Sequence, residues 1–116
     1  TYSIESINQN HSNKDRIIAM YNLAKGQTQT AFEEWLKAVD IPAYASMTSM
    51  SNPAYYRTST LLGEQVKAPF KYVVIIEIES PTEVEKEMAA PTWKDFITDI
   101  ESRIVDAHYI LAEKIA

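Results

Sequence analysis

Short runs of apolar residues occur at four places along the chain and predict four β-strands. They lie within residues 16–23, 44–60, 71–79 and 107–115. The third run is the richest in β-branched residues, which favour strands. In the second run Pro53 lacks a backbone N–H, which predicts a bulge or an edge position. The chain therefore contains the strands of one small sheet.

Two stretches between these runs have the spacing of amphipathic helices. In the first, Thr30 and Glu33 stand at capping-box spacing, and an apolar stripe follows until residues 40–42 end the helix. In the second, residues 80–83 read Ser-Pro-Thr-Glu, a helix start that predicts a short helix to about residue 89. A longer helix restarts near Thr92. Its apolar face is formed by Trp93, Phe96, Ile97, Ile100 and Ile104.

The order of these elements is strand, helix, strand, strand, helix, strand. This βαββαβ order predicts an α+β protein of the ferredoxin-like class, with helices on one face of an antiparallel sheet. Residues 16–116 are expected to form a single domain. Residues 1–15 are mostly polar, and we expect a flexible lead-in there.

The predicted strands are apolar on both faces. In residues 71–79, Val73 and Ile75 point one way while Tyr72, Val74 and Ile76 point the other. A sheet with one face in water would instead alternate apolar and polar residues. A second copy of the same sheet would cover the extra face, so we expect a homodimer whose facing sheets enclose a cavity.

Composition narrows the chemistry that this domain can perform. With 116 residues, no cysteine and two glycines, the chain lacks material for thiolate metal sites, disulfide frameworks and glycine-rich phosphate loops. A net charge of −5 disfavours nucleic acid and anionic lipid surfaces as partners. No apolar stretch is long enough to span a membrane, and the two histidines, His11 and His108, lack metal-ligand spacing. We therefore expect a cytoplasmic protein without a metal site.

Polar side chains within the predicted strands are the candidates for chemistry. Glu77 lies in an apolar strand, where a carboxylate either pairs with a cation or has a raised pKa suited to acid–base catalysis. The alternative is a solvated Glu77, or one paired with Arg57 or Lys71. Arg57 is expected to hold Glu77 or an anionic group of a substrate. Asn22 is the polar exception on the first strand, and His108 is either a proton shuttle or a surface residue.

Aromatic residues supply a second set of candidates. Four tyrosines could stack on a flat ligand and orient it with their hydroxyls, or they could fill the core and the dimer interface. They are Tyr21, Tyr55, Tyr56 and Tyr72. Helical acidic residues are expected to be solvated. They are Glu33, Glu34, Glu85, Glu87, Asp95 and Asp99.

Several of these segments together resemble one family. They are residues 19–23, which read Ala-Met-Tyr-Asn-Leu, followed by Lys25-Gly26; residues 56–63; residues 69–78; and residues 90–92, which read Ala-Pro-Thr. In order and spacing they resemble RedY-like proteins of the HapK type over residues 16–115. The resemblance implies a dimeric α+β barrel and a role in pathways to prodigiosin-type and related pyrrole or indole natural products.

The resemblance also implies a flat, nitrogen-containing aromatic substrate and no metal or organic cofactor. Asn22, Arg57 and Glu77 lie in the matching segments, whereas no family histidine is expected at His108. The leading hypothesis is acid–base catalysis of dehydration, hydration or tautomerisation in the barrel cavity. One alternative is a non-catalytic, chaperone-like protein that binds a reactive intermediate and passes it to pathway partner enzymes. Another, by analogy of fold alone, is a cofactor-independent monooxygenase.

Overall fold

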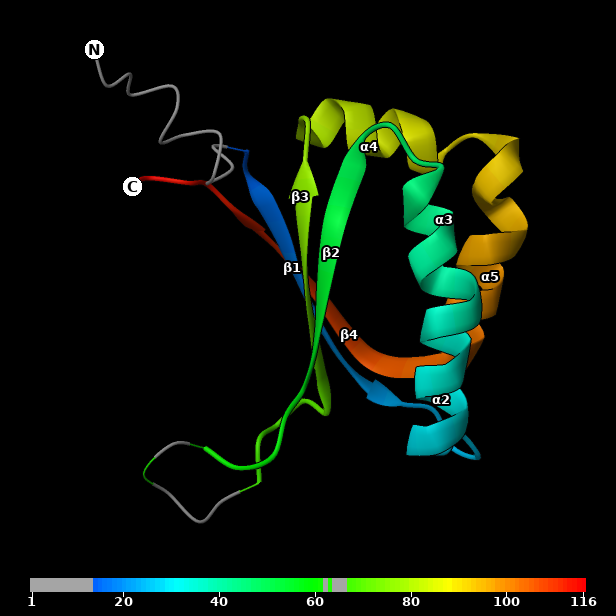
Figure 1. The fold of residues 1–116 in the computed structure, drawn as a ribbon, viewed down its shortest axis with the longest axis vertical. Helices are drawn as coiled ribbons and strands as arrows, with labels where there is room; N and C mark the ends of the chain where they lie inside the picture. Colours follow the sequence, from blue (N-terminus) through cyan, green and yellow to red (C-terminus); the bar gives the residue numbers. More distant parts are fainter. Residues whose placement is uncertain (1–13, 62, 64–66) are drawn as a thin grey trace.

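Four strands pair into one antiparallel sheet in the order β2-β3-β1-β4 (Figure 1). The computed structural model describes residues 14–61, 63 and 67–116. The strands are β1 (Arg16–Leu23), β2 (Met50–Arg57), β3 (Tyr72–Ile78) and β4 (Ile104–Ala112). This order and the alternation with helices confirm the ferredoxin-like α+β fold predicted from the sequence. Most of the predicted lead-in, residues 1–13, lies outside the described residues.

The helices lie on one side of the sheet (Figure 1). The first helical segment runs from α2 (Gln29–Trp35) through the π-helical turn η1 (Leu36–Asp40) into α3 (Ile41–Ala45). The second comprises α4 (Pro81–Met88), the 3₁₀ turn η2 (Pro91–Trp93) and α5 (Lys94–Arg103). The predicted start of α4 is confirmed, because Ser80 caps the helix by accepting a hydrogen bond from the N–H of Glu83.

The predicted ends of the first helix are wrong. Its N-cap is Thr28 rather than Thr30, and the Thr28 hydroxyl accepts from the N–H of Ala31. At the other end Pro42 does not stop the helix, because it lies in the first turn of α3, where no N–H is needed. The π-helical turn η1 joins α2 to α3 with wider backbone hydrogen bonding. This turn places Asp40 on the inner side of the segment, where it is buried.

Two strand boundaries also differ from the prediction. Residues 44 and 45 are helical rather than extended, and β2 begins at Met50. The last strand begins at Ile104 instead of residue 107, and Ile104 fills the core at the strand start instead of ending a helical stripe. The bulge predicted near Pro53 is confirmed, since the register of β2 against β3 shifts between Ser51 and Ala54.

The core lies between the sheet and the helices. Along β3 alternate residues are buried under the helices, and the residues between them lie partly exposed on the opposite face. This opposite surface, here called the open face, is apolar at its centre, where Ile75 lies beside Ile18 of β1 and Ala54 of β2. The prediction that both sheet faces are apolar is therefore confirmed.

Candidate functional site

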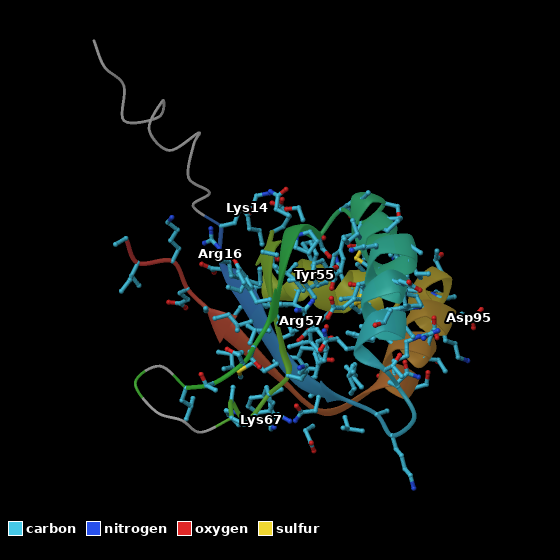
Figure 2. All side chains as sticks on the ribbon, turned by 60° about the horizontal axis from the view of Figure 1, so that its bottom comes forward. Lys14, Arg16, Tyr55, Arg57, Lys67 and Asp95 are labelled. Atoms are coloured by element: carbon cyan, nitrogen blue, oxygen red, sulfur yellow. The ribbon has the colours of Figure 1, made fainter. Side chains whose placement is uncertain are left out.

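A cleft of about 220 Å³ lies between the edge strand β2 and the segment from α2 to α3. The helical segment supplies Leu36 and Ile41 to its walls, and β2 supplies Tyr55, Tyr56 and Arg57. Figure 2 shows the labelled Tyr55 and Arg57 in the space between β2 and these helices. Tyr72 of β3 lies across from Arg57 in the strand register and also lines the cleft. The cleft thus combines aromatic rings, aliphatic walls and one guanidinium.

At one end of the cleft Arg57 forms a two-point ion pair with Glu33 of α2. The Arg57 Nε donates to Glu33 Oε2 at 2.8 Å, and Nη2 donates to Oε1 at 2.6 Å. The Tyr72 hydroxyl donates to the same Oε2 at 2.8 Å. These hydrogen bonds, first of all those from Arg57, lower the pKa of Glu33 to about 2. Glu33 is therefore not the solvated side chain that the sequence predicted, and it stays ionised at neutral pH.

On the inner side of the cleft Tyr55 meets a buried carboxylate. The Tyr55 hydroxyl donates a hydrogen bond to Asp40 Oδ2, and Asp40 is only 2% exposed. Asp40 Oδ1 has no hydrogen-bond partner among the described residues. Burial raises the pKa of Asp40 to about 6. Burial and the hydrogen bond to Asp40 together raise the pKa of Tyr55, which therefore keeps its proton at neutral pH.

Asp40 is a site residue that the sequence did not predict, because residues 40–42 indicate a helix stop. A signal was nevertheless present in the spacing. Asp40 follows Phe32 and Leu36 at intervals of four residues, so it continues the apolar stripe of the helix. A carboxylate on such a stripe faces the core.

The four candidate tyrosines lie in different surroundings. Tyr55, Tyr56 and Tyr72 line the cleft, and Tyr56 is the most open of them at 53% exposed. Tyr21 is buried in the core, where its ring stacks on Tyr72 with ring centroids 6.0 Å apart. The structure therefore brings three of the four tyrosines together at one cleft.

The expected pairing of Glu77 with Arg57 or Lys71 is wrong. Arg57 lies opposite Tyr72, five residues along β3 from Glu77 and therefore about 17 Å away. Lys71 precedes β3 at that same far end. Glu77 instead accepts a hydrogen bond from Asn52 Nδ2 at 2.8 Å, and in the sheet it stands opposite Arg16. Sequence proximity of β2 to β3 gave no information on register, and the register separates the two residues.

Asn22 and His108 lie outside the cleft. Asn22 Oδ1 accepts from the N–H of Lys71 at 2.8 Å, and its Nδ2 donates to the carbonyl of Pro69 at 3.1 Å. The amide thereby fastens the segment before β3 to β1. His108 stands opposite Met20 and meets the ring of Phe70 edge to face, with centroids 5.4 Å apart. Asn22 and Glu77 are six residues apart along the β1–β3 register, or about 20 Å, so the open face does not bring them together within one chain.

Two further helical carboxylates are bound rather than solvated. Glu87 accepts hydrogen bonds from the N–H groups of Thr48 at 3.0 Å and Ser49 at 2.8 Å, which tie α4 to the turn before β2. Asp99 accepts from Trp35 Nε1 at 3.0 Å and joins α5 to α2. These partners come from distant parts of the chain, which local spacing cannot indicate.

Within residues 14–61, 63 and 67–116, no three or more His, Cys, Asp or Glu side chains gather in a group able to hold a metal ion. No helix of this described part of the chain is long and apolar enough to cross a membrane.

Several solved structures have the same fold as this chain. A protein of Arabidopsis thaliana, At3g17210, superposes with a TM-score of 0.73 at 14% identity, covering 88% of this chain and 96% of that one. HapK from Hahella chejuensis gives a TM-score of 0.68 at 22% identity, covering 88% of this chain and 93% of its own. A dimeric ferredoxin-like protein of unknown function from Thermobifida fusca gives 0.60 at 16% identity, covering 86% and 90%.

None of the curated proteins compared with this chain matches it. The model of one family, described as REDY-like protein HapK, matches residues 15–115. This match covers the whole sheet and all the helices, including both sides of the cleft. The chain belongs to the REDY-like HapK family.

Proposed function

We propose that this protein binds a small, flat aromatic heterocycle of the pyrrole or indole type in the cleft beside β2 and assists proton transfer on it. The observation that supports this proposal is the composition of the cleft. Its walls are the aliphatic Leu36 and Ile41 and the ring of Tyr55, and a guanidinium, Arg57, lies at its rim. Pockets for small molecules have this combination of apolar walls and few polar groups.

The size of the cleft favours a compact ligand. Its volume of about 220 Å³ lies below the roughly 300–1,000 Å³ of pockets for drug-sized molecules. One or two fused or linked rings fit this range better than an extended molecule does. The family resemblance supports the same ligand class, together with a role as a tailoring protein in secondary-metabolite biosynthesis.

Arg57 would bind the polar edge of the ligand. Its Nε and Nη2 are engaged by Glu33, and a guanidinium has five N–H donors in all. Its remaining donors suit a carbonyl or anionic oxygen, and they would stabilise negative charge that develops when the ligand loses a proton.

This location differs from the cavity between two facing sheets that the sequence suggested. Glu77 and His108 lie on the open face and remain candidates for a site there. That site would need residues from a second chain, because the polar groups of one open face are spread along the sheet. We favour the cleft, since it assembles its polar groups within one chain.

We further propose that two copies of the chain associate through their open faces. The exposed apolar side chains on this face include Tyr56 at 53% and Ile110 at 46%, and the sheet centre around Ile75 is only partly covered. Apolar surface of this kind favours association. The ferredoxin-like protein from Thermobifida fusca shares the fold and is dimeric, which supports association of two copies.

Incubation with pyrrole and indole carbaldehydes, followed by mass spectrometry, tests the catalytic proposal. We expect a mass or isomer change that Arg57→Gln slows at least tenfold and that Lys94→Gln, a matched change on α5, leaves intact. NMR titration of the same compounds should shift signals of Leu36, Ile41 and Tyr55. Binding without any chemical change would favour the non-catalytic binding protein, and binding only at the open face would overturn the cleft as the site.

A further inference from the structure

Tyr55 connects the cleft to a carboxylate that solvent does not reach. It lines the cleft, and its hydroxyl donates a hydrogen bond to the buried Asp40. A phenol has one proton to donate, and an ionised carboxylate can only accept. The proton of Tyr55 is therefore held by Asp40. The Tyr55 oxygen retains lone pairs, so toward a ligand it could act only as a hydrogen-bond acceptor.

Tyr72 repeats this arrangement at the other end of the cleft. Its hydroxyl donates to Glu33 Oε2, so its oxygen is likewise left to accept. The polar groups of the residues lining the cleft are therefore the acceptor oxygens of Tyr55, Tyr72 and Glu33, the cations Arg57 and Lys37, and the hydroxyl of Tyr56. A complementary ligand carries a donor on its ring and an acceptor or anionic oxygen at its edge.

We propose that Tyr55, oriented by Asp40, makes this cleft selective for aromatic rings that carry an N–H group over rings of the same shape that lack one. The inference rests on the proposed function, and it adds the residue pair that determines specificity. A buried acceptor that a ligand leaves unpaired costs binding energy, which is why such sites reject the analogue without the donor. Asp40 acts here as a positioning residue, because it holds the hydroxyl and does not line the cleft.

The selectivity depends on the charge of Asp40. When Asp40 is protonated, its carboxyl group can donate to the Tyr55 oxygen and occupy the acceptor that the ligand needs. A ligand with a ring N–H therefore binds the ionised form better. Burial raises the pKa of Asp40 to about 6, so Asp40 changes from mostly protonated to mostly ionised between pH 5 and pH 7.5, and the affinity for a ring N–H changes over the same range.

Other groups near the pair do not titrate in this range. Asp40 is faced by the phenols of Tyr21 from β1, Tyr44 from α3 and Tyr55 from β2, and burial raises the pKa of each. Tyr109 of β4 adjoins Tyr21 and Tyr44, and its pKa is also raised by burial. In the cleft Glu33 has a pKa of about 2 and stays ionised beside Arg57 and Lys37.

The test compares two bicyclic probes, indole and benzofuran, which differ in having N–H or oxygen in the ring. NMR titrations of the full chain give the affinity of each probe at pH 7.5 and pH 5. At pH 7.5 we expect indole to bind about tenfold more tightly than benzofuran, the effect of one hydrogen bond of about 1.4 kcal/mol. At pH 5 indole should bind about fivefold more weakly, because only about a tenth of Asp40 is then ionised and the protonated form binds indole about as weakly as benzofuran. Benzofuran should bind equally at both values.

Two variants separate the roles of the pair. Tyr55→Phe should abolish the preference for indole, and Tyr109→Phe, the same change outside the cleft, should retain it. Asp40→Asn should remove the pH dependence of indole binding, and Asp95→Asn on α5 should keep it. Equal binding of indole and benzofuran to the unmodified protein at this cleft would overturn the inference and leave the proposed function standing. Binding of neither probe would overturn both.

Discussion

Arg57 on the edge strand β2 and Glu33 on α2 are joined by two parallel hydrogen bonds of 2.8 and 2.6 Å, which close one end of the cleft. This pair links the strand to the helix that faces it across the cleft. Half of the Arg57 side chain remains exposed, so the guanidinium is both anchored and accessible.

Replacing Arg57 by Gln should change binding more than stability. An exposed ion pair contributes about 0–1 kcal/mol to folding, so we expect a small loss in the free energy of unfolding at pH 7. The pKa of Glu33, now about 2, should rise toward its ordinary value of 4.5. Because the folded pKa is lowered, the stability contributed by the pair is present above pH 4.5 and is lost as pH falls toward 2. Carboxyl NMR and urea denaturation measure both effects.

A loss of several kcal/mol in this variant at neutral pH would contradict the assignment of Arg57 to the site rather than to the fold. Arg57→Lys serves as the conservative control. It keeps the positive charge but cannot form the two-point contact. We expect it to restore the stability and only part of the affinity.

Asp40→Asn should stabilise the protein at neutral pH. The folded pKa of about 6 lies above the ordinary 3.8, so the folded state binds more protons between these values and loses stability as pH rises from about 4 to 6. The shift corresponds to at most about 3 kcal/mol. Urea denaturation at pH 4 and pH 7 measures the free energy of unfolding of both proteins. The value for the variant minus that for the parent should be larger at pH 7 than at pH 4. An unchanged difference would show that Asp40 does not titrate in this range.

Glu87→Ala should destabilise the fold by about 1–3 kcal/mol, because it leaves the N–H groups of Thr48 and Ser49 without their acceptor. Glu85→Ala is a matched control on the same helix, since Glu85 is exposed. It should change stability by no more than about 0.5 kcal/mol. Thermal denaturation of the two variants provides the comparison, and equal midpoints would refute the anchoring role of Glu87.

Ile75→Glu should break the proposed dimer. Ile75 lies at the centre of the open face, where a charge would face the second sheet without a partner. Sedimentation velocity should show the parent as a dimer and this variant as a monomer. Thr82→Glu, at an exposed position of α4, should remain dimeric. A monomeric parent at micromolar concentration would refute the dimer itself.

Glu77→Gln distinguishes the cleft from the open face as the site of chemistry. We expect this variant to fold, bind and turn over indole and pyrrole substrates as the parent does, because Glu77 is about 17 Å from Arg57 along the sheet. The mass-spectrometric assay described above measures the rate. A loss of turnover with unchanged folding would move the active site to the open face and restore Glu77 as the acid or base.

The fold could be predicted from the sequence because the patterns that define its helices and strands are local. The β-branched run of residues 72–78 and the capping serine at Ser80 each define an element through neighbours a few residues away. The two-sided apolar character of β3 likewise followed from alternation alone. The helix stop predicted at Pro42 was wrong for the same reason. A proline usually ends a helix through local contacts, but here the π-helical turn before it lets the helical segment continue.

The site could be predicted from the sequence only in part. Four residues that the sequence indicated as candidates lie together at one cleft, namely Arg57, Tyr55, Tyr56 and Tyr72. The predicted partner of Arg57, Glu77, is wrong, because the carboxylate that Arg57 meets is Glu33, which lies 24 residues away on a helix.

By itself, the sequence determined the order of the elements, the apolar faces of the sheet and the residue types available for chemistry. Strand register and helix docking decided which of those residues meet. The register set Arg57 against Tyr72 rather than beside Glu77, and the helical segment placed Asp40 against Tyr55. Contacts between residues far apart in the chain depend on how whole elements pack, and packing is a property of the assembled core rather than of any local stretch of sequence.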